Sequence, residues 1–80
     1  MTTPILIDAR GHRCPTPTLK LQKAMREAGP GVRLTLLATD PMARIDVPHL
    51  MAGLGGRVVS IDDADGVLTI EVETPAAPTG

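Results

Sequence analysis

The sequence predicts an α/β (α+β) two-layer sandwich with the order β-α-β-α-β-β, in which two helices cover one face of a four-stranded mixed sheet. Its 80 residues allow one domain with a small core. Short runs rich in β-branched residues alternate with segments in which apolar residues have helical spacing. The last two runs flank Asp63-Ala64-Asp65-Gly66, which is typical of a hairpin loop, so the closing hairpin must add an antiparallel strand.

The first half of the chain is expected to form a strand, a helix and a second strand. Residues 4–9 form a short strand that ends near Asp8. Pro15 and Pro17 mark the start of the helix, because N–H groups in a first helical turn have no partner within the helix, and Gly29-Pro30-Gly31 marks its end. The predicted buried face of this helix consists of Pro17, Leu21, Ala24, Met25 and Ala28. Residues 32–39 alternate as a strand does, with one face formed by Leu34, Leu36 and Ala38.

The second half is expected to contain a short helix and the closing hairpin. Pro48 interrupts any helix begun at Asp40-Pro41, so a loose turn over residues 41–45 precedes a helix capped by Asp46. The apolar face of that helix is Val47, Leu50, Met51 and Leu54. The hairpin strands span residues 57–62 and 67–73, with inward-pointing side chains at Leu68, Ile70 and Val72. We therefore expect a single domain over residues 1–74 and a disordered tail over residues 75–80.

The composition excludes several classes of function. The chain has one cysteine, no Phe, Tyr or Trp, and a formal net charge of −1. A lone cysteine excludes an intrachain disulfide and a cysteine-rich zinc site, and we expect neither a cofactor nor a metal. Direct nucleic-acid binding is not expected without aromatic rings or a positive field. No apolar stretch is long enough to span a bilayer and no signal peptide is evident, so we expect a cytoplasmic protein without membrane contact.

Cys14 is the candidate nucleophile. It lies at the predicted amino end of the first helix, where free N–H groups and the helix dipole favour a thiolate. Five of the eight basic residues lie near it in the sequence, namely Arg10, Arg13, Lys20, Lys23 and Arg26. The alternative is that Cys14 is a small buried hydrophobic residue, the usual environment of a lone cysteine. The residue pattern alone leaves both interpretations open.

The other polar candidates have simpler interpretations. His12 is two residues from Cys14, but such close neighbours in a loop seldom point at each other, so a catalytic-base role competes with that of an exposed loop residue. His49 is expected at the surface or at its boundary and lies in no metal-ligand spacing. Asp40 and Asp46 stand where residues that cap helices are expected.

One side of the first helix carries an apolar residue among cations. Leu19 falls outside the predicted buried face, on the side of Lys23 and Arg26. An apolar residue ringed by basic ones is typical of a protein-docking surface, and a solvated charged face is the alternative. Acidic residues gather instead in the closing hairpin, at Asp62, Asp63, Asp65, Glu71 and Glu73. The net charge of −1 is therefore the balance of a basic half and an acidic half.

The segment Asp8-Ala9-Arg10-Gly11-His12-Arg13-Cys14-Pro15-Thr16-Pro17 resembles the TusA/SirA-like sulfur-carrier (sulfurtransferase) family. The signature of that family is an Asp, a Gly and then Cys-Pro-x-Pro at the start of the first helix. The resemblance continues through Lys23, the turn at 29–31, Thr39-Asp40-Pro41 and Asp46-Val47-Pro48, and it covers about residues 5–73. It implies a fold similar to the C-terminal domain of translation initiation factor 3. His12 departs from the family, which usually has an aliphatic residue at that position.

The resemblance implies a sulfur relay. Cys14 would accept sulfane sulfur as a persulfide from a cysteine desulfurase or rhodanese and pass it to an acceptor protein, for example for tRNA thiolation. The thiol would be supported by Arg13, Pro15, Pro17, Asp8 and Gly11, and partners would dock on Leu19, Lys20, Lys23 and Arg26. We expect a monomer that transfers sulfur between molecules, because no second cysteine is present. The alternative is a non-enzymatic SirA-like regulatory or protein-interaction module, in which the basic helix matters and the thiol does not.

Overall fold

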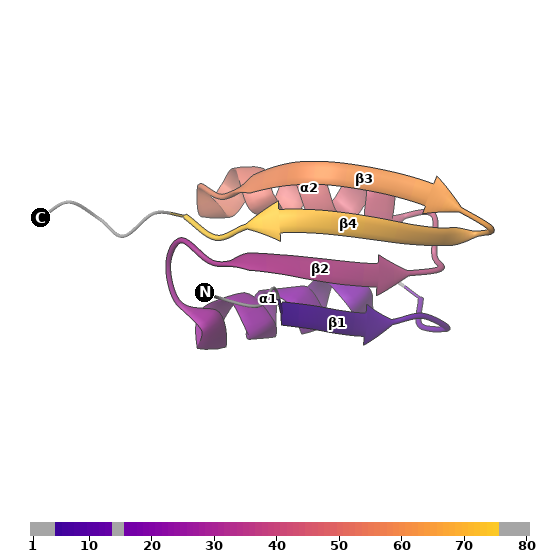
Figure 1. The fold of residues 1–80 in the computed structure, drawn as a ribbon, viewed down its shortest axis with the longest axis horizontal. Helices are drawn as coiled ribbons and strands as arrows, with labels where there is room; N and C mark the ends of the chain where they lie inside the picture. Colours follow the sequence, from indigo (N-terminus) through magenta and orange to yellow (C-terminus); the bar gives the residue numbers. More distant parts are fainter. Residues whose placement is uncertain (1–4, 14–15, 76–80) are drawn as a thin grey trace, which may run out of the picture.

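Six elements follow one another along the chain in the predicted order (Figure 1). The computed structural model describes residues 5–13 and 16–75. The elements are β1 (Ile5–Ala9), α1 (Thr16–Ala28), β2 (Arg33–Ala38), α2 (Ala43–Leu54), β3 (Arg57–Ala64) and β4 (Val67–Glu73). The predicted two-layer fold is therefore confirmed.

The four strands form one mixed sheet in the order β1-β2-β4-β3. β1 and β2 pair in parallel, and β4 is antiparallel to both of its neighbours, β2 and β3. It follows that β1, β2 and β3 all run in one direction, with β4 inserted against them. Both helices lie on the same face of the sheet, α1 behind β1 and β2 and α2 behind β3 and β4 (Figure 1).

The core fills the space between the helices and the sheet. The face predicted for α1 is buried at Pro17, Leu21 and Met25, while Ala24 and Ala28 pack against the core from its margin. The alternation predicted for the inner strands is also confirmed, because the inward residues are fully or nearly fully buried: Leu34, Leu36, Ala38, Leu68, Ile70 and Val72. A sheet with one covered face has this alternation, since successive side chains point to opposite faces.

The start of α2 differs from the sequence prediction. The helix begins at Ala43, so Asp46 lies in its first turn and does not cap it. The Asp40 carboxylate accepts a hydrogen bond from the Met42 amide at 2.9 Å, and the Asp40 carbonyl accepts one from Ala43 at 3.1 Å. These bonds turn the chain directly into the helix, and α2 then continues through Pro48 to Leu54. The predictions of a loose turn over residues 41–45 and of an Asp46 cap were therefore wrong. Pro48 removes one N–H donor from α2 but does not end the helix.

The hairpin turn is tighter than the sequence indicates. β3 extends to Ala64 and β4 begins at Val67, which leaves a turn of two residues, Asp65 and Gly66. Both have positive φ, 53° and 78° respectively. This is the backbone of a type I′ turn, whose twist matches that of the paired strands, and Asp-Gly is one of its preferred sequences.

Thr74 joins the end of β4 to the turn after α1. Its side chain is buried, accepting a hydrogen bond from the Val32 amide at 2.7 Å and donating one to the Gly29 carbonyl at 2.8 Å. The Thr74 amide donates to the Val32 carbonyl at 2.9 Å. The carbonyl of Pro75, the first residue of the expected tail, accepts a hydrogen bond from Gly31 at 3.0 Å, and residues 76–80 lie outside the described residues.

Candidate functional site

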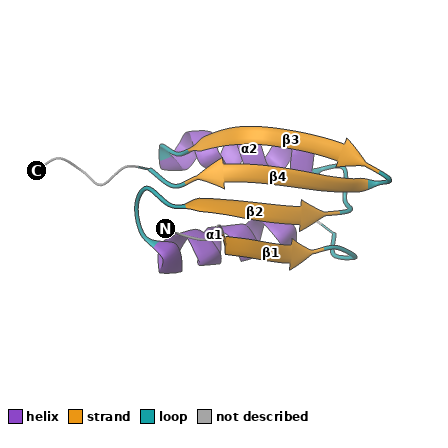
Figure 2. Ribbon diagram, in the orientation of Figure 1, coloured by secondary structure: helices purple, strands orange, loops and turns teal. Residues whose placement is uncertain are grey.

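The candidate site lies where β1 and β2 end. Carboxyl ends of parallel strands meet at the same edge of a sheet, and here each strand leads through a loop into a helix (Figure 2). Cys14 and Pro15 lie outside the described residues, so the site is built from the residues on either side of them. The Thr16 amide donates a hydrogen bond to the Arg13 carbonyl at 3.0 Å. Arg13 therefore lies immediately before the first turn of α1.

The loop after β1 is held by hydrogen bonds that the sequence does not indicate. The His12 amide donates to the Ala9 carbonyl at 3.2 Å, and Gly11 adopts a φ of 84°, which favours glycine. The Gly11 amide donates to the Thr39 hydroxyl oxygen at 2.9 Å. Thr39 directly follows β2, so this bond joins the two loops across the end of the sheet.

Asp8 and Arg10 form a local ion pair at the start of this loop. The Arg10 guanidinium donates to both carboxylate oxygens of Asp8, at 2.9 and 2.7 Å, and the Arg10 amide adds a third bond at 3.1 Å. These hydrogen bonds, the side-chain ones first, lower the pKa of Asp8 from 3.8 to about 2, and the charge of Lys20 acts in the same direction. Asp8 is thus ionised at neutral pH, and its partner is Arg10.

An open polar hollow lies beside Arg13. Its volume is about 300 Å³, and it is lined by Gly11, His12, Arg13, Thr39, Asp40 and Pro41. Both loops contribute to it, and its His12 and Arg13 side chains are exposed. Such a hollow is accessible to a group on another protein, whereas a site for a small molecule normally encloses its ligand.

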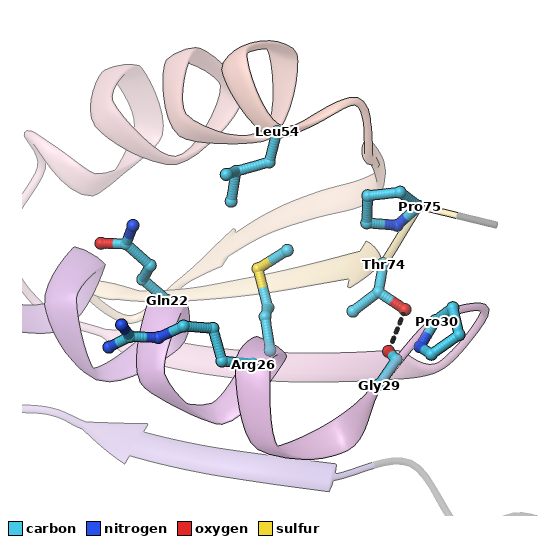
Figure 3. A pocket seen from close by; sticks show the side chains of 8 residues that line it. Gln22, Arg26, Gly29, Pro30, Leu54, Thr74 and Pro75 are labelled. Carbon is cyan, nitrogen blue, oxygen red and sulfur yellow. Dashed lines mark hydrogen bonds between the residues drawn. The ribbon is translucent and has the colours of Figure 1, made fainter. Parts of the chain in front are cut away.

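The four predicted docking residues do not face a single groove. Leu19 is exposed on α1, as predicted. Lys20 and Lys23 line a groove against β1 together with Ile5, Leu6, Ile7, Asp8, Ala24 and Glu27, and we call this the edge groove. Arg26 lines a different groove, on the side of α1 that faces α2 (Figure 3). Around α1, Lys23 is three residues from both Lys20 and Arg26 and so lies between these two cations, and the two grooves lie on either side of the row.

The groove that contains Arg26 lies between the carboxyl ends of the two helices. Its volume is about 370 Å³ and it is lined by Gln22, Met25, Arg26, Gly29, Pro30, Leu54, Thr74 and Pro75. Figure 3 shows Leu54 on the α2 side and Gln22 and Arg26 on the α1 side, with Thr74 hydrogen-bonded to Gly29 at the far end. α1 begins next to Arg13, and this groove lies at its other end.

Sequence reasoning missed features of three residues that follow β2. Thr39 was noted for its position, but its bond to Gly11 joins residues 28 positions apart and has no local signal. Met42 and Ile45 are 47% and 63% exposed at the start of α2. Their exposure follows from the earlier start of α2, which the apolar pattern around Pro48 concealed.

The described residues contain neither a metal site nor a membrane span. Over residues 5–13 and 16–75, no group of three or more His, Cys, Asp or Glu side chains is placed to hold a metal ion. In the same part of the chain, no helix is long and apolar enough to cross a membrane.

Comparison with known proteins identifies the family. The family model described as sulfurtransferase TusA matches residues 5–74. The chain belongs to the TusA family. It is 37% identical over 68 residues to the sulfur carrier protein TusA of Pseudomonas paraeruginosa, a match covering 82% of this chain and 86% of that protein. It is 38% identical over 68 residues to a putative sulfur carrier protein of Archaeoglobus fulgidus, covering 84% and 88%.

A solved structure supports the fold assignment. The SirA-like protein from Desulfitobacterium hafniense superposes with a TM-score of 0.80 at 29% identity, covering 89% of this chain and 97% of that one. The TusA/SirA-like resemblance found in the sequence is therefore confirmed. Within this TusA-family fold, the candidate site lies at the loops that follow β1 and β2, and it includes Arg13 and Thr39.

Proposed function

We propose that this chain is a sulfur carrier in which Cys14 takes up sulfane sulfur as a persulfide and passes it to an acceptor protein. The observation that carries the proposal is the match of residues 5–74 to the sulfurtransferase TusA family, in which similar proteins are named sulfur carriers. Cys14 is the single cysteine of the chain and therefore the one thiol able to hold the sulfur.

The chemistry is two successive thiolate displacements. The Cys14 thiolate attacks the terminal sulfur of a donor persulfide, which forms a new S–S bond and releases the donor thiolate. A thiolate of the acceptor then attacks the terminal sulfur on Cys14, which breaks that S–S bond and restores the Cys14 thiolate. Each step exchanges one S–S bond for another, so no external oxidant or reductant is consumed.

The residues before Cys14 support this chemistry. Asp8 engages Arg10, whereas Arg13 has no ion pair within the described part of the chain and is exposed. We assign to Arg13 the stabilisation of the negative charge on the thiolate or persulfide, since hydrogen bonds from guanidinium groups to anions are strong. The bond from Gly11 to Thr39 fixes the loop that carries Arg13. Pro15 and Pro17 would stiffen the start of α1.

The proposed partners are proteins. A cysteine desulfurase or a rhodanese would supply the sulfur, and an acceptor in a pathway such as tRNA thiolation would receive it. Leu19, Lys20, Lys23 and Arg26 would contribute to docking, and so would the exposed Met42 and Ile45 around the start of α2. We infer a monomer that works in the reducing cytoplasm, where a free thiol persists.

Mass spectrometry after incubation with a persulfide donor tests the proposal. Wild-type protein should gain the mass of one sulfur atom, and a thiol reductant should remove it. Cys14→Ser should gain nothing under the same conditions. No adduct on the wild type, or an equal adduct on Cys14→Ser, would reject the carrier function and favour the interaction module. A Cys14→Ser chain that still restores the phenotype of a deletion strain would favour the module as well.

A further inference from the structure

β1 is an edge strand whose outer side is free in the described part of the chain. It pairs with β2 on one side, and no strand over residues 5–13 and 16–75 pairs with it on the other. Its first two residues are large and apolar, and Ile5 is 38% and Leu6 62% exposed. An unpaired edge presents a row of N–H and C=O groups that can bind an additional strand.

The opposite edge of the sheet, β3, has the features that block strand addition. A bulge interrupts its pairing with β4 between Val58 and Ser60. The carboxyl-terminal half of β3 carries the exposed acidic residues Asp62 and Asp63. Bulges and charges are the devices by which natural sheets protect an edge. Within β1, by contrast, the single charged side chain is Asp8, which is already engaged by Arg10.

The edge groove, about 410 Å³ in volume, runs along β1 beneath α1. Lys20 and Lys23 line it, and neither forms an ion pair within residues 5–13 and 16–75. Because α1 returns the chain from the end of β1 to the start of the parallel β2, Lys20 lies near Asp8 and Glu27 lies toward Ile5. The groove is thus apolar at its floor, basic toward the Cys14 loop and acidic at its far end.

We propose that the β1 edge binds an extended acidic segment of a protein partner as a fifth strand. Main-chain hydrogen bonds to β1 would hold the segment. On the face of the segment toward α1, apolar side chains would fill the floor of the edge groove and carboxylates would reach Lys20 and Lys23. The inference deepens the proposed function, on which it rests for the existence of protein partners. A strand bound there lies next to the chain that leads from Asp8 to Cys14.

A partner segment fits this edge better than a second copy of the chain. β1 has five residues, and at about 3.3 Å per residue its edge is roughly 17 Å long. A stable protein–protein interface buries about 1,200–2,000 Å², which so short an edge does not supply. Brief contact through a short strand suits a relay, because partners must leave after each transfer.

Nuclear magnetic resonance with a designed probe tests the site. The probe is a short capped peptide in which valine and glutamate alternate along one face and threonine occupies the other (Val-Thr-Glu-Thr-Val-Thr-Glu), and its control replaces each glutamate with lysine. The glutamate peptide should shift the amide resonances of β1 and of Lys20 and Lys23, while those of β3 stay in place. Shifts at β3 alone, or an equal response to the lysine peptide, would overturn the proposal. Self-association that protects the β1 amides without peptide would assign the edge to a second copy instead and overturn it too.

Charge reversal on the two helices supplies the test variant and its control. Lys20→Glu with Lys23→Glu should weaken binding of the glutamate peptide by about tenfold, since two exposed ion pairs are replaced by repulsion. Arg44→Glu reverses one exposed charge on α2, outside the edge groove, and should leave the affinity unchanged. Equal losses in both variants would show a general charge effect and overturn the site.

Sulfur loading of the wild type from a small-molecule persulfide separates the two proposals. Normal loading without any peptide binding rejects the strand site and leaves the carrier function standing. Peptide binding at β1 without sulfur loading rejects the carrier function and leaves the strand site standing.

Discussion

Buried hydrogen bonds hold the chain where β4 finishes, whereas exposed ones hold it where β1 and β2 finish. We call residues 29–32, 56 and 73–75 the closed end, and residues 9–13 and 39–42 the loop end. At the closed end, Thr74 is 5% exposed and joins Gly29 and Val32. At the loop end, the exposed Thr39 joins the exposed Gly11.

The difference in burial between the two sets of hydrogen bonds predicts that the closed end determines stability and that the loop end affects sulfur loading. Removing a partner from a buried polar group costs about 1–3 kcal/mol, but an exposed group exchanges its partner for water at much lower cost. The closed end therefore stabilises the fold, and the loop end contributes less to its stability. Substitutions at the closed end should change stability alone, and substitutions at the loop end should change sulfur loading.

The largest loss of stability is expected at Gly56, between α2 and β3. A Cβ at this position would overlap the Met51 side chain and lie 2.7 Å from the Glu73 carbonyl oxygen, a backbone atom that cannot move aside without disturbing β4. Gly56→Ala should lower the free energy of unfolding by about 3 kcal/mol, measured by urea denaturation. Gly53→Ala, where a Cβ meets nothing within 4 Å, is the control. Similar midpoints for the two variants would show that the closed end tolerates crowding.

Thr74→Val tests the buried hydrogen bonds of the closed end. The variant leaves the Val32 amide and the Gly29 carbonyl without their side-chain partner, so we expect a loss of about 2 kcal/mol in the free energy of unfolding. Thr74→Ser keeps the hydroxyl and should lose less. The rate of sulfur loading on Cys14 should equal that of the wild type. A variant that loads slowly would contradict the separation of the two ends.

Thr39→Val makes the same substitution at the loop end. Its cost in stability should stay below about 1 kcal/mol, because water can replace the hydroxyl at the exposed Gly11 amide. Without this bond the loop that carries Arg13 is less fixed, so the rate of sulfur loading should fall a few-fold. Thr39→Ser should load at the wild-type rate. Loading by Thr39→Val at the wild-type rate would show that the bond between the loops does not serve the thiol.

Local patterns were sufficient for the number and order of the elements, but not for the start of α2 or for the contacts between elements. The buried face of α1 at Leu21 and Met25 follows from spacing within one helix, and so does the exposure of Leu19. The insertion of β4 between β2 and β3 depends on which strands pair best, which no single segment encodes. The bond between Gly11 and Thr39, like those made by Thr74, joins distant parts of the chain. For the same reason the sequence grouped Arg26 with Lys20 and Lys23, although their side chains line different grooves.

The smallest effect is expected from the exposed pair of Asp8 and Arg10. The pKa of Asp8 is lowered from 3.8 to about 2, so the carboxylate contributes stability that is present above pH 3.8 and is lost as pH falls toward 2. At neutral pH the pair is complete, and the stability of Asp8→Asn should depend less on pH below 3.8 than that of the wild type. The direct measurement is an NMR titration of the Asp8 carboxyl carbon, with an expected midpoint near 2 in the wild type. In Arg10→Gln the midpoint should move back toward 3.8, and an unchanged midpoint would mean that Arg10 does not hold Asp8 at the loop end.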